Sequence, residues 1–210
     1  MTILYDFDGT IADDLQEIVK IWNQLARERN YKGSKEISEG GINALRSMDA
    51  KAAMKALGVP LAHLPSWVAA VRSRLAERIA LVKPFVGLVE VLKELKTRQH
   101  KQGIVTSNSE DNVREFLCRN DLDIFDLIHS GSSVFGKGRV IKKLLAREGL
   151  DKRETVYVGD EIRDVEAACA SGIKSIAVTW GANSREILVR ARPDSIIDKP
   201  EELLGVIEKI

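Results

Sequence analysis

Short apolar runs alternate with amphipathic stretches along most of the chain. Four of the runs predict buried strands, at 3–5, 103–106, 155–158 and 175–178. Weaker strand candidates lie at 125–129 and 195–197. The segments between these runs carry apolar residues three or four positions apart, which is the spacing of an α-helix. Strands that alternate with helices of this length are typical of a parallel sheet, so the pattern predicts an α/β, doubly wound (Rossmann-like) fold.

The stretch from residue 13 to 82 departs from this alternation. One apolar stripe at helical spacing consists of Leu15, Ile18, Val19, Trp22, Leu25 and Ala26. A second stripe, after Pro65-Ser66, consists of Val68, Val71, Leu75 and Ile79. This stretch contains almost no β-branched run. We therefore predict an α/β core domain over residues 1–12 and 83–210, into which a helical cap domain over residues 13–82 is inserted.

Composition narrows the possible partners and the compartment. The 210 residues include 32 Lys and Arg against 31 Asp and Glu, a net charge of +1, and only 5% are aromatic. This balance gives no pull toward nucleic acid or an anionic membrane. No apolar run approaches the roughly 18 residues of a membrane span. No secretory signal pattern follows Met1, so we expect a cytoplasmic protein.

Acidic residues follow two of the predicted strands directly. Asp6 and Asp8 come after the first strand, and Asp160 and Asp164 come after the strand at 155–158. The carboxyl ends of parallel strands open onto one crevice, where such side chains meet. Taken singly, each pair also fits a turn or an acidic helix start. Taken together, they predict a magnesium site, because this ion prefers oxygen ligands.

Polar residues at two further places could bind a phosphate. Ser107 and Asn108 follow the strand at 103–106 and offer a hydroxyl and a backbone N–H group. Thr106 competes with Ser107 for the hydroxyl role, and Ser107 is favoured because it lies nearer the end of the strand. Lys137 stands between Gly136 and Gly138 in front of a predicted helix, so its loop can approach an anion closely. A helix cap and a surface lysine are the simpler alternatives.

The order of these motifs resembles that of the haloacid dehalogenase superfamily of phosphohydrolases. The motifs are a hydrophobic residue followed by Asp-x-Asp-Gly-Thr at 6–10, a strand that ends in Ser or Thr, a lysine, and Gly-Asp-x-x-x-Asp at 159–164. The segments 83–87, 92–95 and 178–181 are most similar to the phosphoglycolate phosphatase branch. The helical insertion resembles the small cap of that superfamily.

The resemblance implies a role for each matching residue. Asp6 would attack phosphorus and form an aspartyl-phosphate, and Asp8 would protonate the leaving group and later accept a proton from water. The Mg²⁺ ligands would be Asp6, the main-chain carbonyl of Asp8, Asp160 and Asp164, the last directly or through water. The phosphoryl oxygens would be bound by Thr10, Ser107, Asn108 and Lys137.

The resemblance therefore implies a magnesium-dependent phosphatase of small phosphate monoesters, with 2-phosphoglycolate as a candidate substrate. A sugar-phosphate phosphomutase uses the same core and stays open. A signalling receiver domain combines similar residues, but its phosphorylated aspartate follows its acidic pair along the chain. The cap residue Arg46 either binds a substrate carboxylate or lies on a solvated helix face. The leaving group and the oligomeric state stay open.

Overall fold

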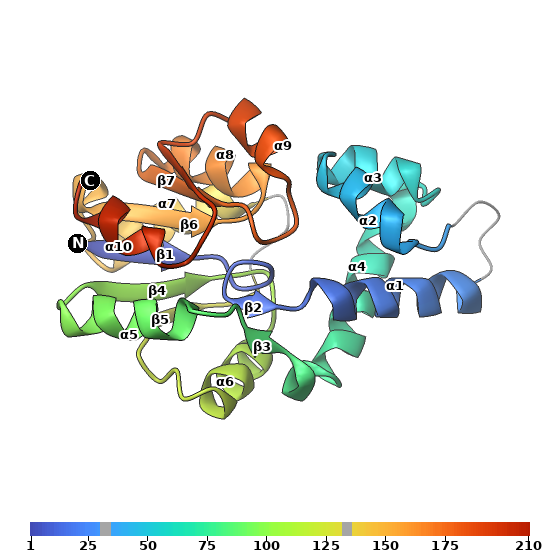
Figure 1. The fold of residues 1–210 in the computed structure, drawn as a ribbon, viewed down its shortest axis with the longest axis horizontal. Helices are drawn as coiled ribbons and strands as arrows, with labels where there is room; N and C mark the ends of the chain where they lie inside the picture. The colour runs from blue at the N-terminus through green and yellow to red at the C-terminus, as the bar shows by residue number, and fades with distance from the viewer. Residues whose placement is uncertain (30–34, 132–135) are drawn as a thin grey trace.

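A six-stranded parallel sheet forms the centre of the larger part of the molecule (Figure 1). The computed structural model describes residues 1–29, 35–131 and 136–210. The strand order is β5-β4-β1-β6-β7-β8. The strands are β1 (Thr2–Tyr5), β4 (Lys101–Val105), β5 (Leu127–His129), β6 (Thr155–Gly159), β7 (Lys174–Val178) and β8 (Ser195–Ile197). The predicted α/β fold is confirmed, and all six strands coincide with predicted runs.

Strand β1 lies in the middle of the sheet because it is apolar on both faces. Ile3 and Leu4 have no exposed surface. Thr2 pairs with Lys101 of β4 on one side and with Thr155 of β6 on the other. The ladder continues one residue further, where the Asp6 amide donates to the Val158 carbonyl at 2.9 Å. The ends of β1 and β6, with the acidic residues that follow them, are thus adjacent.

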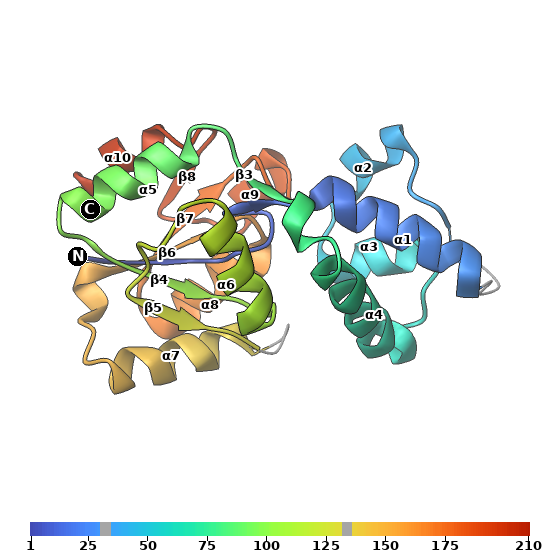
Figure 2. The same cartoon turned by 90° about the horizontal axis from the view of Figure 1, so that it is seen from below.

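Helices cover both faces of the sheet (Figure 2). Helices α7 and α8 pack on one face against Leu4, Val105 and Tyr157. Helices α5, α6 and α10 contribute to the apolar cluster around Ile3 and Tyr5. The helices are α5 (Leu88–Thr97), α6 (Glu110–Arg119), α7 (Lys137–Arg147), α8 (Ile162–Ser171), α9 (Arg185–Arg190) and α10 (Glu202–Ile207). Within the described ranges, no helix is both long and apolar enough to cross a membrane.

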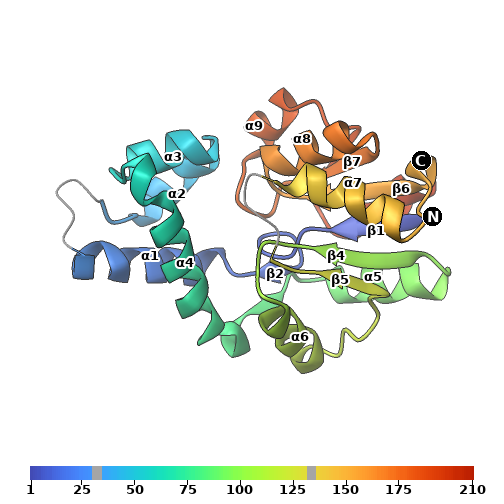
Figure 3. The ribbon, with the colours of Figure 1, turned by 180° about the vertical axis from the view of Figure 1, so that it is seen from behind.

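Four helices lie beyond the carboxyl ends of the strands (Figure 3). They are α1 (Leu15–Arg29), α2 (Glu39–Arg46), α3 (Ala50–Ala56) and α4 (Leu64–Ala76). Helices α1 and α4 pack together through the rings of Trp22 and Trp67, whose centroids are 4.6 Å apart. We call residues 13–82 the cap segment; its status as a separate domain stays a prediction.

The buried face of α1 differs from the predicted stripe. Ile21, outside the stripe, is fully buried, whereas Ile18 and Val19 are only half-buried. Ile21 and Leu25 are one helical turn apart, so the packed face runs through them in the second half of the helix. The buried residues of α1 are Ile21, Trp22, Leu25 and Ala26.

A two-stranded antiparallel ribbon connects the cap segment to the sheet. Strand β2 (Ala12–Asp13) carries the chain out, and β3 (Lys83–Pro84) brings it back. Ala12 pairs with Pro84, and Asp13 pairs with Lys83. The pattern of the sequence did not predict these two short strands. Their pairing places the segment that leaves the core beside the segment that returns to it.

Candidate active site

Asp6 follows β1 directly and is almost fully buried. The Phe7 amide donates to Asp6 Oδ1 at 2.9 Å, and Lys137 Nζ donates to Oδ2 at 2.6 Å. Burial raises the pKa of Asp6 to about 7, although the charge of Lys137 opposes this rise. The carboxylate is therefore fixed in orientation and shielded from bulk water.

Lys137, the first residue of α7, joins the two acidic motifs. Its ammonium donates to Asp6 Oδ2 and to Asp164 Oδ1, both at 2.6 Å, and its side chain is only 4% exposed. Burial alone would lower the pKa of Lys137, but Asp164 and Asp6 raise it well above its ordinary value. The ammonium also lies over the ring of Tyr157, 5.4 Å from the ring centroid, in a cation–π contact that stabilises its charge. Lys137 therefore remains a cation at the centre of the site.

Asp160 and Asp164 lie beside Asp6 because β6 is the neighbour of β1. Asp160 Oδ1 accepts from the Thr10 hydroxyl, and Oδ2 accepts from the Ala182 amide, both at 2.7 Å. Burial and neighbouring carboxylates raise the pKa of Asp160 well above its ordinary value. Asp164 Oδ2 accepts from the Glu161 amide at 3.0 Å in the capping box that starts α8.

The donor set of this cluster fits a magnesium ion. One carboxylate oxygen from each of Asp6, Asp160 and Asp164 lies within 4.8 Å of the other two, and all three residues are buried. Lys137 contacts two of the three carboxylates, which leaves negative charge that a divalent cation would neutralise. All donors are hard oxygen atoms, the kind that Mg²⁺ prefers over nitrogen or sulfur.

Asp8 belongs to a separate hydrogen-bonded group. Its Oδ1 accepts from Asn108 Nδ2 at 2.7 Å, and its Oδ2 is 3.5 Å from the Thr106 hydroxyl. The backbone N–H group of Asn108 donates to Thr106 Oγ1 at 3.0 Å. Thr106 and Asn108 are buried, whereas Ser107 is partly exposed. Of the two competing hydroxyls, the structure brings that of Thr106 next to Asp8.

Thr10, expected to contact phosphate, has a different partner here, because its hydroxyl donates to Asp160. Two glycines, Gly9 and Gly181, let their loops lie close to Asp160 and to each other. A Cβ on Gly9, whose φ is +71°, would lie 2.4 Å from Asp160 Oδ2. A Cβ on Gly181, in the loop after β7, would lie 2.2 Å from the Gly9 carbonyl oxygen. No sequence pattern places Gly181 in the site, since only the fold brings this loop to Asp160.

Two further charged residues of the site were also missed. Asp14 is buried, and its Oδ1 accepts from the Gly9 amide at 3.2 Å. Burial and the neighbouring Asp8 raise the pKa of Asp14 well above its ordinary value. Arg163 Nη2 donates to Glu161 Oε1 at 2.5 Å, and its charge also acts on Asp6. Each looks like an ordinary charged residue at a helix start, so no sequence pattern singles it out.

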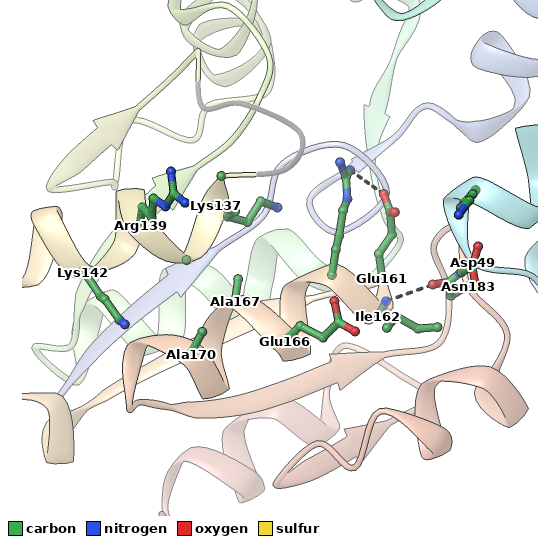
Figure 4. Close-up of a pocket in the computed structure, with 14 residues that line it drawn as sticks. Asp49, Lys137, Arg139, Lys142, Glu161, Ile162, Glu166, Ala167, Ala170 and Asn183 are labelled. Carbon is green, nitrogen blue, oxygen red and sulfur yellow. Dashed lines mark hydrogen bonds and ion pairs between the residues drawn. The ribbon is translucent and has the colours of Figure 1, made fainter. Parts of the chain in front are cut away.

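A cavity of about 630 Å³ lies beside this cluster, and Lys137 is the member of the cluster that lines it (Figure 4). Lys137, Glu161 and Arg163 line it from the core, and Asp49 and Lys51 line it from the cap segment. Both the core and the cap segment therefore contribute side chains to the wall of this cavity.

The cap segment also contacts the loop that follows β7. Arg46 Nη2 donates to the Thr179 carbonyl, and the Ser184 amide donates to the Arg46 carbonyl, both at 2.7 Å. Asn183 Nδ2 donates to the Met48 carbonyl at 3.2 Å. Arg46 was expected to bind substrate or to face solvent, but its guanidinium instead contacts the main chain of the core.

The chain matches the family model described as haloacid dehalogenase-like hydrolase over residues 3–178. Because this match covers most of the chain, the protein belongs to the haloacid dehalogenase-like hydrolases. The resemblance seen in the motifs is thereby confirmed, and the protein is a phosphatase of this family.

Two curated relatives agree with this assignment, and one solved structure shares the fold. The chain is 34% identical over 209 residues to a phosphoglycolate phosphatase of Synechococcus elongatus, covering 99% of this chain and 97% of the relative. It is 31% identical over 134 residues to the pyrophosphatase PpaX of Bacillus mycoides, covering 62% of each. The crystal structure of a predicted phosphatase from Clostridium acetobutylicum superimposes with a TM-score of 0.82 at 22% identity, covering 100% of this chain and 98% of that one.

Proposed function

We propose that this protein is a magnesium-dependent phosphatase that hydrolyses a small phosphate monoester through an aspartyl-phosphate. The observation that carries the proposal is the buried cluster of Asp6, Asp160 and Asp164 around Lys137, with Asp8 two residues beyond Asp6. Phosphoryl transfer needs in-line placement of the reacting oxygens and neutralisation of their charge. The cluster offers both a carboxylate nucleophile and a fixed cation.

The magnesium ion would be held by the carboxylates of Asp6 and Asp160, the Asp8 main-chain carbonyl and Asp164, directly or through water. When bound, it would neutralise charge on the phosphoryl oxygens and on Asp6. Lys137 would bind a phosphoryl oxygen as a point charge. The hydroxyl of Thr106 or of Ser107 would bind another, and Asn108 would orient Asp8.

Asp6 and Asp8 would carry out different steps of the reaction. An oxygen of Asp6 would form a bond to phosphorus while the bond from phosphorus to the ester oxygen breaks. Asp8 would give its proton to that departing oxygen and release a neutral alcohol. Asp8 would then take a proton from water, whose oxygen attacks phosphorus, and the return of the carboxylate of Asp6 would release inorganic phosphate.

The cap segment would close over the cavity and choose the leaving group, since lids exclude water and select substrates. We propose 2-phosphoglycolate as the first substrate to test. Its support is the 34% identity, over nearly the whole chain, to a relative described as a phosphoglycolate phosphatase.

The test is release of inorganic phosphate from a panel of small phosphate monoesters by the purified protein with MgCl₂. We expect phosphate release that stops after chelation and returns with Mg²⁺. The matched control is Asp6→Asn, which keeps the shape of the side chain. Hydrolysis that survives exhaustive chelation would contradict the proposal, and an isomerised sugar phosphate as product would replace it with a mutase.

A further inference from the structure

We propose that Asn183, in the loop after β7, is a positioning residue through which docking of the cap segment fixes the carboxylates of Asp160 and Asp164. Docking of the cap segment and binding of Mg²⁺ would then strengthen each other. This inference rests on the proposed magnesium site and goes beyond the proposed function, because it states how the cap segment acts on that site.

The side chain of Asn183 is bonded to the core at one end and to the cap segment at the other. It is only 7% exposed. Its Oδ1 accepts from the backbone N–H group of Ile162 at 3.0 Å (Figure 4), and its Nδ2 donates to the carbonyls of Met48 at 3.2 Å and Arg46 at 3.5 Å. Ile162 begins α8 and Arg46 ends α2, where a helix leaves backbone groups without an internal partner. One side chain thus satisfies helix ends in two parts of the chain.

The chemistry of these partners requires an amide at position 183. A backbone N–H group can only donate and a carbonyl can only accept, so the oxygen of Asn183 must face Ile162 and the nitrogen must face the cap segment. An aspartate would keep the bond to Ile162 but would turn its second oxygen toward the two carbonyls. An alanine would lose the bonds on both sides. The two ends of the connection can therefore be separated by substitution.

The main chain around Asn183 holds Asp160. The backbone N–H group of Ala182 donates to Asp160 Oδ2 at 2.7 Å, and that of Asn183 donates to the Asp160 carbonyl at 3.2 Å. Gly181 packs so closely that a Cβ there would lie 2.4 Å from Asp160 Oδ2. A shift of this loop would therefore move a proposed metal ligand.

The bond to Ile162 extends the same connection to Asp164. Ile162 is the first residue of α8, and Asp164 lies in the first turn of that helix. On the cap side, Met48 is followed directly by Asp49, which lines the cavity. Asn183 thus connects one wall of the cavity to both of the aspartates that follow β6.

The decisive experiment is a double-mutant cycle on Mg²⁺ affinity, measured by calorimetry with MgCl₂ and the metal-free protein. Arg46→Ala removes the bond from the cap segment to the Thr179 carbonyl. Arg46→Ala and Asn183→Ala should each weaken Mg²⁺ binding by roughly 3- to 10-fold, the size of one hydrogen bond. The double variant should bind Mg²⁺ about as weakly as Asn183→Ala alone, because without this side chain the cap segment no longer acts on the carboxylates.

Hydrogen exchange of the Ser184 backbone N–H group gives a readout that needs neither metal nor turnover. This group donates to the Arg46 carbonyl at 2.7 Å, so it exchanges when the cap segment leaves the loop. Ile162→Pro removes the N–H group bonded to Asn183 and should speed this exchange by roughly 3- to 10-fold. Proline suits the first position of a helix. Glu161, with φ −120° and ψ 155°, already has the conformation required before proline, so α8 should remain intact.

Two further variants complete the exchange measurement. Ile162→Ala alters the same side chain but keeps the N–H group, so exchange at Ser184 should stay within about twofold of the wild type. Asn183→Asp keeps the bond to Ile162 but loses the donors to the cap segment, so it should speed exchange as Asn183→Ala does. Aspartate caps a helix as well as asparagine does. Wild-type exchange in Asn183→Asp would therefore show that Asn183 only caps α8, which would overturn the proposal.

This inference and the proposed function fail in different ways. Losses of Mg²⁺ affinity that multiply in the double variant, or equal exchange in Ile162→Pro and Ile162→Ala, would overturn the role of Asn183 while the phosphatase activity stands. A wild type that binds no Mg²⁺ would contradict the proposed function, and hydrogen exchange would still decide whether Asn183 connects the cap segment to α8. If Asn183→Ala does not fold, Ile162→Pro replaces it in the cycle.

Discussion

Asp6 and Asp8 are two residues apart, yet their surroundings differ. Asp6 accepts a hydrogen bond from the ammonium of Lys137, whereas Asp8 accepts one from the neutral side-chain amide of Asn108. A carboxylate beside a fixed cation suits attack on phosphorus, and one that contacts amide and hydroxyl groups suits proton transfer. Replacing each aspartate by asparagine should therefore have different effects.

Asp6→Asn removes the attacking charge, so turnover should fall to background for every ester. Asp8→Asn removes a proton donor, which is typically worth about 10²–10⁴-fold. The loss should be smaller for p-nitrophenyl phosphate, whose leaving group departs without a proton, than for an alkyl phosphate. Steady-state kinetics on both esters measures the difference.

Trapping of a phosphoenzyme tests the same assignment. In Asp8→Asn, the intact Asp6 can still be phosphorylated, but the attacking water has no base, so acid-quenched protein should retain phosphate. Equal losses on aryl and alkyl esters, with no retained phosphate, would leave Asp8 with only its main-chain role.

The phosphate-binding hydroxyl can be assigned by a matched pair of variants. Thr106 is buried beside Asp8, and Ser107 is partly exposed. We expect Thr106→Val, which keeps the shape, to lower kcat/KM by roughly 10- to 100-fold, and Ser107→Ala to lower it by less. The opposite order, measured by phosphate release, would assign the hydroxyl to Ser107 and leave Thr106 as the group that positions Asn108.

The sequence located those site residues that follow strands. Asp6 and Asp160 could be found because strand ends in a parallel sheet meet at one edge. Lys137 could be found because two glycines flank it in front of a predicted helix. The partner of Thr10 and the contact of Arg46 with the Thr179 carbonyl could not, because they depend on the path of loops that the fold brings together. Hydrophobic periodicity carries no information about either.

At the scale of elements, length decided which ones were predictable. Strands β1, β4, β6 and β7 have four or five residues that are nearly all buried, so their apolar runs are continuous. Strands β2 and β3 have two residues each, and α9 has six. No periodicity can be recognised in segments so short.

The contact between the cap segment and the loop after β7 leads to another prediction. Arg46 binds the Thr179 carbonyl, and the same loop donates the Ala182 amide to Asp160. We expect Arg46→Ala to lower kcat/KM by roughly 3- to 10-fold on every ester, with the substrate ranking unchanged. The substitution weakens the contact between the cap segment and the core but removes no contact with the substrate.

Phosphate release from 2-phosphoglycolate, ethyl phosphate and phosphoethanolamine provides the measurement. A changed ranking in Arg46→Ala would return Arg46 to the role of a substrate-binding residue. An unaltered rate on every ester would show that the contact with Thr179 contributes nothing to turnover.

At the scale of the whole molecule, the buried carboxylates link stability to pH and metal. The pKa of Asp6 is about 7, and those of Asp14 and Asp160 are also raised. An unfolded aspartate titrates near pH 4, at about 3.9. Between these values the folded protein holds protons that the unfolded chain has lost, so these groups make stability fall as pH rises toward 7.

We therefore expect Mg²⁺ to raise the melting temperature of the metal-free protein more at pH 8 than at pH 5.5. At the lower pH the cation must displace protons, and at the higher pH it neutralises bare carboxylates. Thermal unfolding with MgCl₂ or EDTA across this range measures the effect, which is about 2.7 kcal/mol at a hundred times Kd. Asp6→Asn should reduce the pH dependence, and an equal shift at both pH values would contradict the linkage.

The central position of β1 bears on how the protein is made. This strand is synthesised before its partners, which begin at Lys101 and Thr155, and both flank it in the finished sheet. At about 5–20 residues per second, roughly 8–30 s separate the synthesis of β1 from that of β6. During that time the nascent chain holds an apolar segment without its neighbours, while α1 and α4 can already pack together. The cap segment proposed to choose the substrate is thus able to assemble before the core that would cleave it.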